Sequence, residues 1–213
     1  MKVVLDVENT VTRRDGKLHL DPFESTNTLV MVGVQIEGEK PKHFTFDHAE
    51  YDCKYEYRKQ DCDTLQKILD ETTVLIGQNI NHDLLWLWET GFKYDGIVWD
   101  TMLAEYIFQR GIKEPLSLEA IAERRDLSAK KQDTMKQYLK QGVPVSEIPY
   151  EELKEYLYAD LATTWALYDE QSADMHDKAN RELSTVLDLT MHTCMLLSRI
   201  YRTGFKVDTK ALE

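Results

Sequence analysis

The first apolar stretch of the chain carries two carboxylates. Residues 3 to 10 begin with an apolar run rich in β-branched side chains, which predicts a buried strand, yet they carry Asp6 and Glu8 two positions apart. Because successive strand residues point to opposite faces, both carboxylates are predicted on one face. Like charges on an apolar face repel each other and resist desolvation, so the pair needs compensation. A divalent metal ion would provide it; the alternative is an edge strand whose acidic face meets water.

A second polar group falls where a predicted strand meets a predicted helix. Residues 74 to 80 form an apolar strand-like run, and residues 84 to 88 have helical spacing. Asn79 therefore lies near the end of the strand and Asp83 in the first turn of the helix. Proteins with alternating strands and helices place ligands at this edge of the sheet. The alternatives are that Asp83 caps the helix and Asn79 completes a turn.

A third group lies in a long predicted helix, residues 150 to 175. Tyr156 and Asp160 are four residues apart and share a face beside the apolar stripe of Leu157 and Leu161. Asp is unfavourable inside helices, and no basic residue stands at helical spacing on its C-terminal side, so it needs another partner. The alternative is an Asp on a solvated face.

In this order and spacing, the motifs Asp-x-Glu, Asn-x-x-x-Asp and Tyr-x-x-x-Asp resemble those of the four-carboxylate (DEDD) proofreading exonucleases, in their Tyr subgroup. Residues 76–83, 99–104 and 116–122 look like the 3′-5′ exonuclease domain of family A DNA polymerases, the relatives of bacterial DNA polymerase I. Residues 196–212 resemble the helix and extended segment that lead from this domain into the polymerase thumb.

The resemblance implies an α/β, ribonuclease-H-like (DnaQ-like) fold. Its mixed sheet would begin with an antiparallel meander and be flanked by helices. It also implies hydrolysis of phosphodiesters with two Mg²⁺ ions, for which Mn²⁺ can substitute. Asp6 would bridge both ions, Glu8 and Asp160 would complete the first site, and Asp83 would hold the second. Tyr156 would orient the attacking water as a hydrogen-bonding group, since its ordinary pKa near 10 makes it a poor base at neutral pH.

The implied substrate is the 3′ end of single-stranded or frayed DNA, because only a frayed end brings its phosphate into such a site. The chain departs from the family where Asn9 separates Glu8 from Thr10, and where Thr12 replaces an apolar wedge for the terminal base. Stacking would then fall to Val11, His82 or Met102. The candidate substrate-binding residues are Thr10, Gln78, Asn79, His82 and Met102.

The remaining pattern predicts the elements that position these residues. A polar turn at residues 13 to 17 is followed by a loop, and residues 47 to 61 show no clear period. Further strands are predicted at residues 28–36, 43–46 and 97–99, and further helices at residues 63–69, 101–108, 116–123, 129–140 and 180–202.

A chain of 213 residues suits one substantial domain. We assign residues 1–178 to the 3′-5′ exonuclease domain and residues 179–213 to a helical connector toward a polymerase domain absent from this chain. The polymerase, in the same or a partner chain, is thus an expected partner. Because the resemblance begins at residue 3, a bacteriophage-type or otherwise compact polymerase is the expected source.

The formal net charge of −12 argues against a large basic surface for nucleic acid. That inference is weak here, because two bound divalent ions would offset about four units of charge. The cysteines at 53, 62 and 194 form no metal-binding pattern, which favours reduced thiols in the cytoplasm, the host's if the protein is viral, over a bridge between residues 53 and 62. The chain has no apolar leader and no apolar run of about 18 residues, so neither secretion nor a membrane partner is expected. No small-molecule cofactor besides the metal ions is expected either.

Two other functions remain open. An RNA 3′-5′ exonuclease of the ribonuclease D kind shares the same carboxylates and tyrosine, although the polymerase-like tail disfavours it. A catalytically idle exonuclease fold could serve as the scaffold of a polymerase, but such domains usually lose one or more carboxylates, and here every position is occupied.

Overall fold

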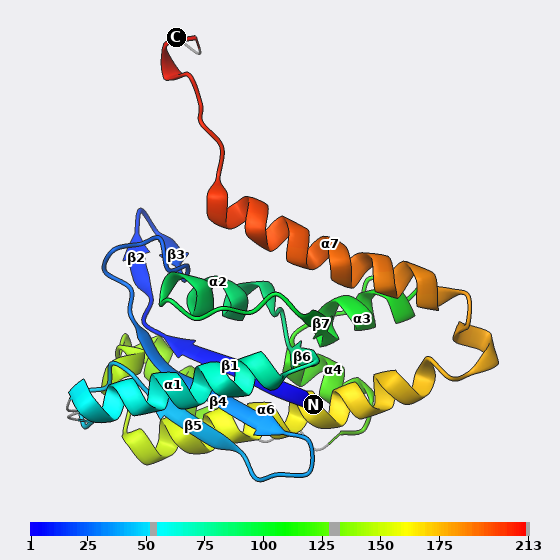
Figure 1. Cartoon of the computed structure of the whole chain (residues 1–213), viewed down its shortest axis with the longest axis horizontal. Helices are drawn as coiled ribbons and strands as arrows, with labels where there is room; N and C mark the ends of the chain where they lie inside the picture. Colours follow the sequence, from blue (N-terminus) through cyan, green and yellow to red (C-terminus); the bar gives the residue numbers. More distant parts are fainter. Residues whose placement is uncertain (52–54, 128–132, 212–213) are drawn as a thin grey trace.

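The fold is built around a five-stranded mixed sheet (Figure 1). A computed structural model describes residues 1–51, 55–127 and 133–211 of the chain. The strands are antiparallel in the pairs β5–β4 and β4–β1 and parallel in the pairs β1–β6 and β6–β7, which confirms the predicted mixed sheet with its N-terminal meander. In their order across the sheet they are β5 (Lys42–Thr45), β4 (Leu29–Ile36), β1 (Lys2–Asn9), β6 (Val74–Gly77) and β7 (Ile97–Asp100).

Helices cover both faces of the sheet. Side chains of α1, α2 and α7 share one core with the β1 side chains Val3, Leu5 and Val7, whereas α6 packs on the opposite face against Val4 (Figure 1). Period-2 alternation puts Asp6 and Glu8 on the Val4 face, under α6. The helices are α1 (Tyr55–Glu71), α2 (Asn81–Glu89), α3 (Thr101–Phe108), α4 (Leu118–Arg124), α5 (Asp133–Gln141), α6 (Tyr150–Asp174) and α7 (Leu183–Thr203), with single 3₁₀ turns at Val145–Glu147, Lys178–Asn180 and Thr209–Ala211.

A glycine lets α6 approach the sheet. Gly33 on β4 pairs with Asp6 on β1 and faces α6. A Cβ at this position would lie 2.8 Å from Leu157 Cγ and 2.9 Å from Leu161 Cδ1, which is closer than side chains pack. The absence of a side chain at Gly33 thus sets how near the helix, with Tyr156 and Asp160 on it, lies to the β1 carboxylates.

Two predicted boundaries were wrong in informative ways. Helix α1 begins at Tyr55, whereas the predicted helix began at residue 63. The prediction missed the first two turns because they are mostly polar and show no apolar period. Strand β6 ends at Gly77, because the chain turns at Asn79, whose φ is 58°. Other elements agree within a few residues. The predicted helix at 129–140 and the alternative bridge between residues 53 and 62 fall partly outside the described residues.

The sequence analysis missed a hairpin. Residues predicted as a polar turn and loop form β2 (Thr12–Arg14) and β3 (Lys17–His19), which pair antiparallel. Asp15 and Gly16 both have positive φ, at 52° and 75°, as expected for the tight turn that Asp-Gly favours. This pair was the signal that could have identified the hairpin, but the strands are too short and polar to show a period.

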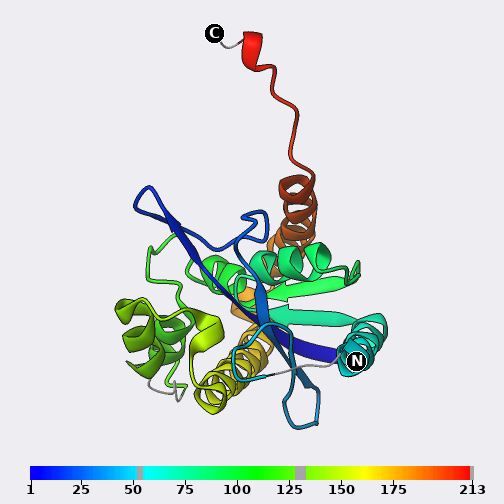
Figure 2. The ribbon, with the colours of Figure 1, turned by 90° about the vertical axis from the view of Figure 1, so that its left-hand side faces the viewer.

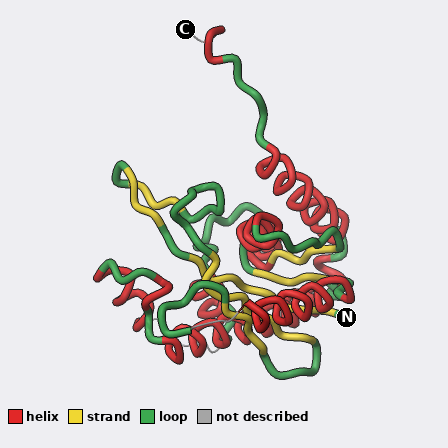
Figure 3. Tube along the Cα trace, turned by 60° about the vertical axis from the view of Figure 1, so that its left-hand side comes forward, coloured by secondary structure: helices red, strands yellow, loops and turns green. Residues whose placement is uncertain are grey.

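Helix α7 belongs to the body of the molecule. Its residues Leu187, Met191, Cys194 and Met195 are buried in the same core as α2. After α7 the chain leaves the body as an extended segment (Figure 3). Among the described residues, no helix has the length and apolar character needed to cross a membrane.

We expect Gly33→Ala to destabilise the protein by about 1–3 kcal/mol, because the added methyl group overpacks the contact with α6. Urea unfolding measures this difference. The double variant Gly33→Ala with Leu157→Ala tests the cause, since the smaller side chain at 157 makes room. Its loss of stability should be smaller than the sum of the two single losses, and simple additivity would argue against overpacking.

Candidate active site

Strand β1, helix α2 and helix α6 bring four carboxylates together at one end of the sheet. Asp6 and Glu8 come from β1, Asp83 is the third residue of α2, and Asp160 lies in α6. The charge of Asp160 acts on Asp6, and the charges of Asp6, Asp160 and Asp83 all act on Glu8. Residues separated by more than 150 positions in sequence thus form one electrostatic cluster.

Asp6, Glu8 and Asp83 hold protons more tightly than free carboxyl groups do. Burial, reinforced by the charge of Asp160, raises the pKa of Asp6 to about 8. Burial and then the charge of Asp6 raise the pKa of Glu8 and the pKa of Asp83 well above their ordinary range. A nearby cation would lower these pKa values, so the cluster is a strong attractor for positive charge.

A backbone hydrogen bond joins Asp83 to β1. The Val7 N–H donates to Asp83 Oδ1 at 3.0 Å, and Asp83 is 2% exposed. The parallel ladder between β1 and β6 last pairs Val4 with Ile76, so Val7 lies beyond it and its N–H is satisfied by α2 instead. The alternative that Asp83 caps its helix is wrong, because the N-cap position is Ile80.

Asp100 fixes the turn between β6 and α2. It is 1% exposed and caps α3 by accepting from the N–H groups of Met102, at 2.9 Å, and Leu103, at 3.1 Å. It also accepts from the N–H groups of Asn79, at 3.2 Å, and Ile80, at 3.0 Å. Sequence reasoning did not identify this role, although an Asp directly before a helix is a signal for an N-cap.

Tyr156 points toward the carboxylate cluster. Burial raises the pKa of its phenol well above the ordinary value, and the charges of Asp160 and Glu8 raise it further. The Tyr156 side chain is hydrogen-bonded to Asp160. At neutral pH it therefore remains a protonated phenol, suited to hydrogen bonding and not to general-base catalysis.

Two of the candidate substrate-binding residues use their polar atoms within the fold. Gln78 donates to the Leu116 carbonyl at 2.8 Å and accepts from Thr101 Oγ1 at 2.5 Å. Thr10 Oγ1 accepts from the Thr28 N–H at 2.7 Å. Both side chains thus hold neighbouring backbone in place.

His82 is likewise engaged. Its Nε2 lies 2.8 Å from Asn9 Oδ1, and the Asn9 amide donates to the carbonyls of Thr10, at 2.7 Å, and Leu20, at 3.1 Å. Because the Asn9 nitrogen is the donor in those two bonds, its oxygen accepts from His82. Burial lowers the pKa of His82, which favours the neutral ring. Asn9, noted above only as a departure from the family pattern, therefore provides a second link between β1 and α2, besides the bond from Val7 to Asp83.

Asn79 and Met102 border open space. They line a groove of about 580 Å³ between the β6–α2 turn, the start of α3 and the C-terminal end of α7, where Tyr201 and Phe205 also lie. Of the candidate substrate-binding residues, these two are the ones placed in this groove.

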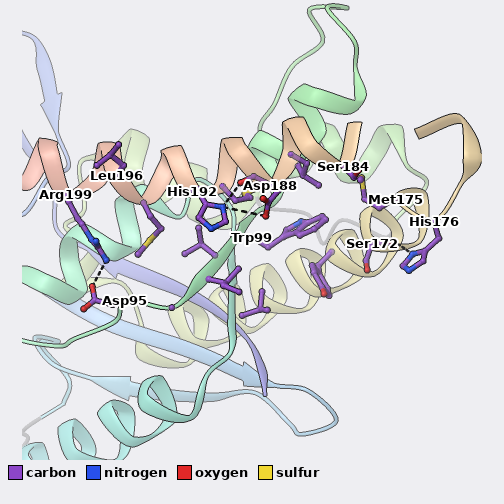
Figure 4. Close-up of a pocket in the computed structure, with 18 residues that line it drawn as sticks. Asp95, Trp99, Ser172, Met175, His176, Ser184, Asp188, His192, Leu196 and Arg199 are labelled. Carbon is purple, nitrogen blue, oxygen red and sulfur yellow. Dashed lines mark hydrogen bonds and ion pairs between the residues drawn. The ribbon is translucent and has the colours of Figure 1, made fainter. Parts of the chain in front are cut away.

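A second groove, of about 700 Å³, lies between β7, the end of α6 and α7 (Figure 4). On its lining an ion pair joins Arg199 to Asp95 at 2.8 Å, and His192 Nδ1 lies 3.6 Å from Asp188 Oδ1. None of the carboxylates of the cluster lines it, so it is separate from the candidate active site.

The cluster suits a hard divalent cation by its chemistry, because Mg²⁺ prefers carboxylate oxygens. Among the described residues, no three Asp, Glu, His or Cys side chains already stand in an arrangement that would hold a metal ion. The carboxylate oxygens are therefore the right type of ligand for such an ion, and the side chains would have to move closer together to bind it.

A family model described as 3′-5′ exonuclease matches residues 21–174. The matched region begins after β1 and includes Asp83, Tyr156 and Asp160, whereas Asp6 and Glu8 precede it.

The solved structures with a similar fold include nucleases and a polymerase. NrnC of Brucella melitensis with bound Mg²⁺ is 16% identical, with a TM-score of 0.66 over 97% of this chain and 88% of that one. NrnC bound to pGG has the same identity and coverage and a TM-score of 0.67. The family B DNA polymerase of the archaeon Pyrobaculum calidifontis is 17% identical, with a TM-score of 0.56 over 95% of this chain and 29% of that one. These likenesses concern the fold and confirm the predicted ribonuclease-H-like class.

The raised pKa of Asp6 predicts how stability depends on pH when no divalent cation is present. An unfolded Asp releases its proton near pH 4, whereas folded Asp6 keeps its proton up to about pH 8. The folded state binds the extra proton in this window, so the free energy of unfolding should fall as the pH rises from about 4 to about 8. Thermal denaturation in EDTA across this range measures the slope.

Asp6→Asn removes the titrating group. In EDTA at about pH 8 this variant should be more stable than the wild type, and its slope should be smaller. Asp47→Asn, a change at an exposed carboxylate outside the cluster, is the matched control and should keep the wild-type slope. A wild-type melting temperature that held constant or rose across the window would contradict the raised pKa.

Proposed function

This chain belongs to the 3′-5′ exonuclease family, and from that premise we propose that it removes nucleotides from the 3′ end of single-stranded or frayed DNA. The observation that carries the proposal is the convergence of Asp6, Glu8, Asp83 and Asp160 on one end of the sheet, with Tyr156 beside them. Burial and mutual repulsion make the charged form of these carboxylates unfavourable. Such perturbed groups are typical of functional sites, here one where a cation and a phosphate would bind.

We assign the four carboxylates to two divalent ions, Mg²⁺ with Mn²⁺ as substitute. Bound there, the ions would lower the pKa of a coordinated water and stabilise the negative charge that develops on the phosphate. Tyr156, a protonated phenol in hydrogen-bond contact with Asp160, orients the attacking water. The Val7 N–H keeps the Asp83 carboxylate aimed at the β1 pair, so the protein supplies fixed positions for charge.

We further propose that the activity proofreads for a family A DNA polymerase in the cytoplasm. The resemblance of residues 76–83, 99–104 and 116–122 to that family supports this role. So does the apolar surface after residue 178, which includes Leu189, 66% exposed, and Phe205, 86% exposed. Residues 1–178 would be the exonuclease domain and residues 179–213 the connector. The connector packs on the domain through the buried face of α7, and its exposed apolar side chains would meet the polymerase.

An RNA 3′-5′ exonuclease of the ribonuclease D kind is the second candidate. The observation in its favour is the fold likeness to NrnC, which was solved with pGG. The idle-scaffold alternative is disfavoured, because each of the four carboxylates is present.

The decisive assay incubates 5′-labelled single-stranded DNA with the protein and Mg²⁺ or Mn²⁺, beside the Asp6→Ala variant and an EDTA control. We expect products shortened stepwise from the 3′ end, absent in EDTA and in the variant. RNA of the same sequence, run in parallel, separates the two candidate substrates. Full activity of Asp6→Ala would contradict the assignment of the active site. An inactive but folded wild type would favour the alternative that the domain is a catalytically idle scaffold.

Tyr156→Phe should lower kcat by about 10²-fold, because the hydrogen bond that positions the water is lost. The carboxylates remain, so added Mg²⁺ should raise the melting temperature of the variant as it does that of the wild type. Tyr158→Phe is the matched control. That hydroxyl lies on the same helix but is 2.7 Å from His43 Nδ1, so its loss should leave kcat near wild type. Equal effects of the two changes would contradict the role of Tyr156.

A further inference from the structure

The β2–β3 hairpin projects from the body as an arm (Figure 2). It begins at Thr12, four residues after Glu8, and continues the direction of the strand that carries the candidate catalytic carboxylates. We call residues 12–19 the arm.

The arm is basic in an acidic protein. The arm has three basic residues, Arg13, Arg14 and Lys17, and one acidic residue, Asp15. Its formal charge is therefore +2, whereas that of the whole chain is −12. Arg13 and Lys17 are exposed, and in the part of the chain that the structure describes they have no ion-pair partner. Arg14 pairs with Glu24 at 3.1 Å, with its side chain still 60% exposed. Positive charge is thus concentrated and available on this arm.

A buried amide holds the base of the arm. Asn27, 8% exposed, donates to the carbonyls of His19, at 2.9 Å, and Asp21, at 3.0 Å. Its oxygen accepts from Thr12 Oγ1 at 2.8 Å. Both strands of the arm are therefore fixed to one side chain where they leave the body.

The same region is tied to the active-site elements. The Leu20 carbonyl accepts from Asn9 Nδ2 and from Trp86 Nε1, each at 3.1 Å. Asn9 directly follows Glu8 in β1, and Trp86 lies three residues after Asp83 in α2. These bonds hold the arm in a fixed relation to the carboxylate cluster, so its charges are pre-organised with respect to that site.

We propose that the arm binds the phosphate backbone of the substrate strand, on the 5′ side of the phosphate at the carboxylate cluster. This inference rests on the proposed function. At about 3.3 Å per residue, Arg13 lies at most about 17 Å along the chain from Glu8, a span that a strand of a few nucleotides covers. Exposed Arg and Lys side chains bind phosphates without reading sequence. The arm therefore contributes affinity for long strands and none for a substrate too short to reach it.

The test compares two double variants that remove equal charge from different hairpins. Arg13→Ser with Lys17→Ser removes the unpaired charges of the arm. Lys40→Ser with Lys42→Ser changes the turn and the start of β5 in the β4–β5 hairpin, whose turn lies at the opposite end of β1 because Ile36 pairs with Val3. All four side chains are exposed, so both variants should keep the wild-type melting temperature.

Binding is measured without cleavage in the Asp6→Asn background. The probe is a fluorescein-labelled oligothymidylate of about 12 nucleotides, titrated at several salt concentrations. Loss of two phosphate contacts should weaken binding roughly fivefold to tenfold at low salt and reduce the slope of log Kd against log salt by about 1.4. The Lys40 and Lys42 variant should bind within about twofold of the parent.

Cleavage then separates this inference from the proposed function. With the Asp6 carboxylate intact, the arm variant should lose kcat/KM on the long strand and keep it on a thymidine dinucleotide. An unchanged kcat/KM on the long strand, or the same loss of kcat/KM on both substrates, would contradict the proposed binding role of the arm. If the wild type bound the long strand through the arm but cleaved neither substrate, the exonuclease proposal would be wrong, whereas the proposed binding role of the arm would be supported.

Discussion

Repulsion among carboxylates at one end of the sheet is the constraint on which the rest of the structure depends. Burial, together with the charges of their neighbours, raises the pKa values of Asp6, Glu8 and Asp83, so the folded chain without a cation holds these carboxylates at a cost in stability. The apolar core on both sides of β1 offsets that cost. A site of this kind lowers stability and at the same time attracts a positive ion strongly.

The carboxylates stay in place through several kinds of contact. Strand alternation puts Asp6 and Glu8 on one face, and the Val7 N–H donates to Asp83 and is hydrogen-bonded to Asp6 as well. The close packing at Gly33 sets the position of Asp160 on α6. Asp100 adds a further restraint, since it accepts from backbone N–H groups of both the β6–α2 turn and the first turn of α3. Backbone groups donate most of these hydrogen bonds, so the geometry depends on fold more than on the identity of neighbouring side chains.

The sequence predicted what depends on period and spacing. Alternation put Asp6 and Glu8 on one face, and helical spacing put Tyr156 beside Asp160. Contacts between distant residues carry no such local signal, so the roles of Asn9 and Asp100 appeared only in the structure. Gln78 and His82 were expected at the substrate, yet their polar atoms are used by the fold, a distinction that depends on which partners lie nearby.

Net charge is a poor guide to where a chain can bind nucleic acid. At physiological ionic strength, exposed charges more than about 8 Å apart are largely screened, so a phosphate responds to the side chains next to it and not to the total of −12. The carboxylate cluster and the basic arm are separate in space but joined through Asn9 and Leu20. An acidic protein can therefore hold a polyanion, provided that its positive side chains are fixed where the strand leaves the site and its acidic ones where cations gather.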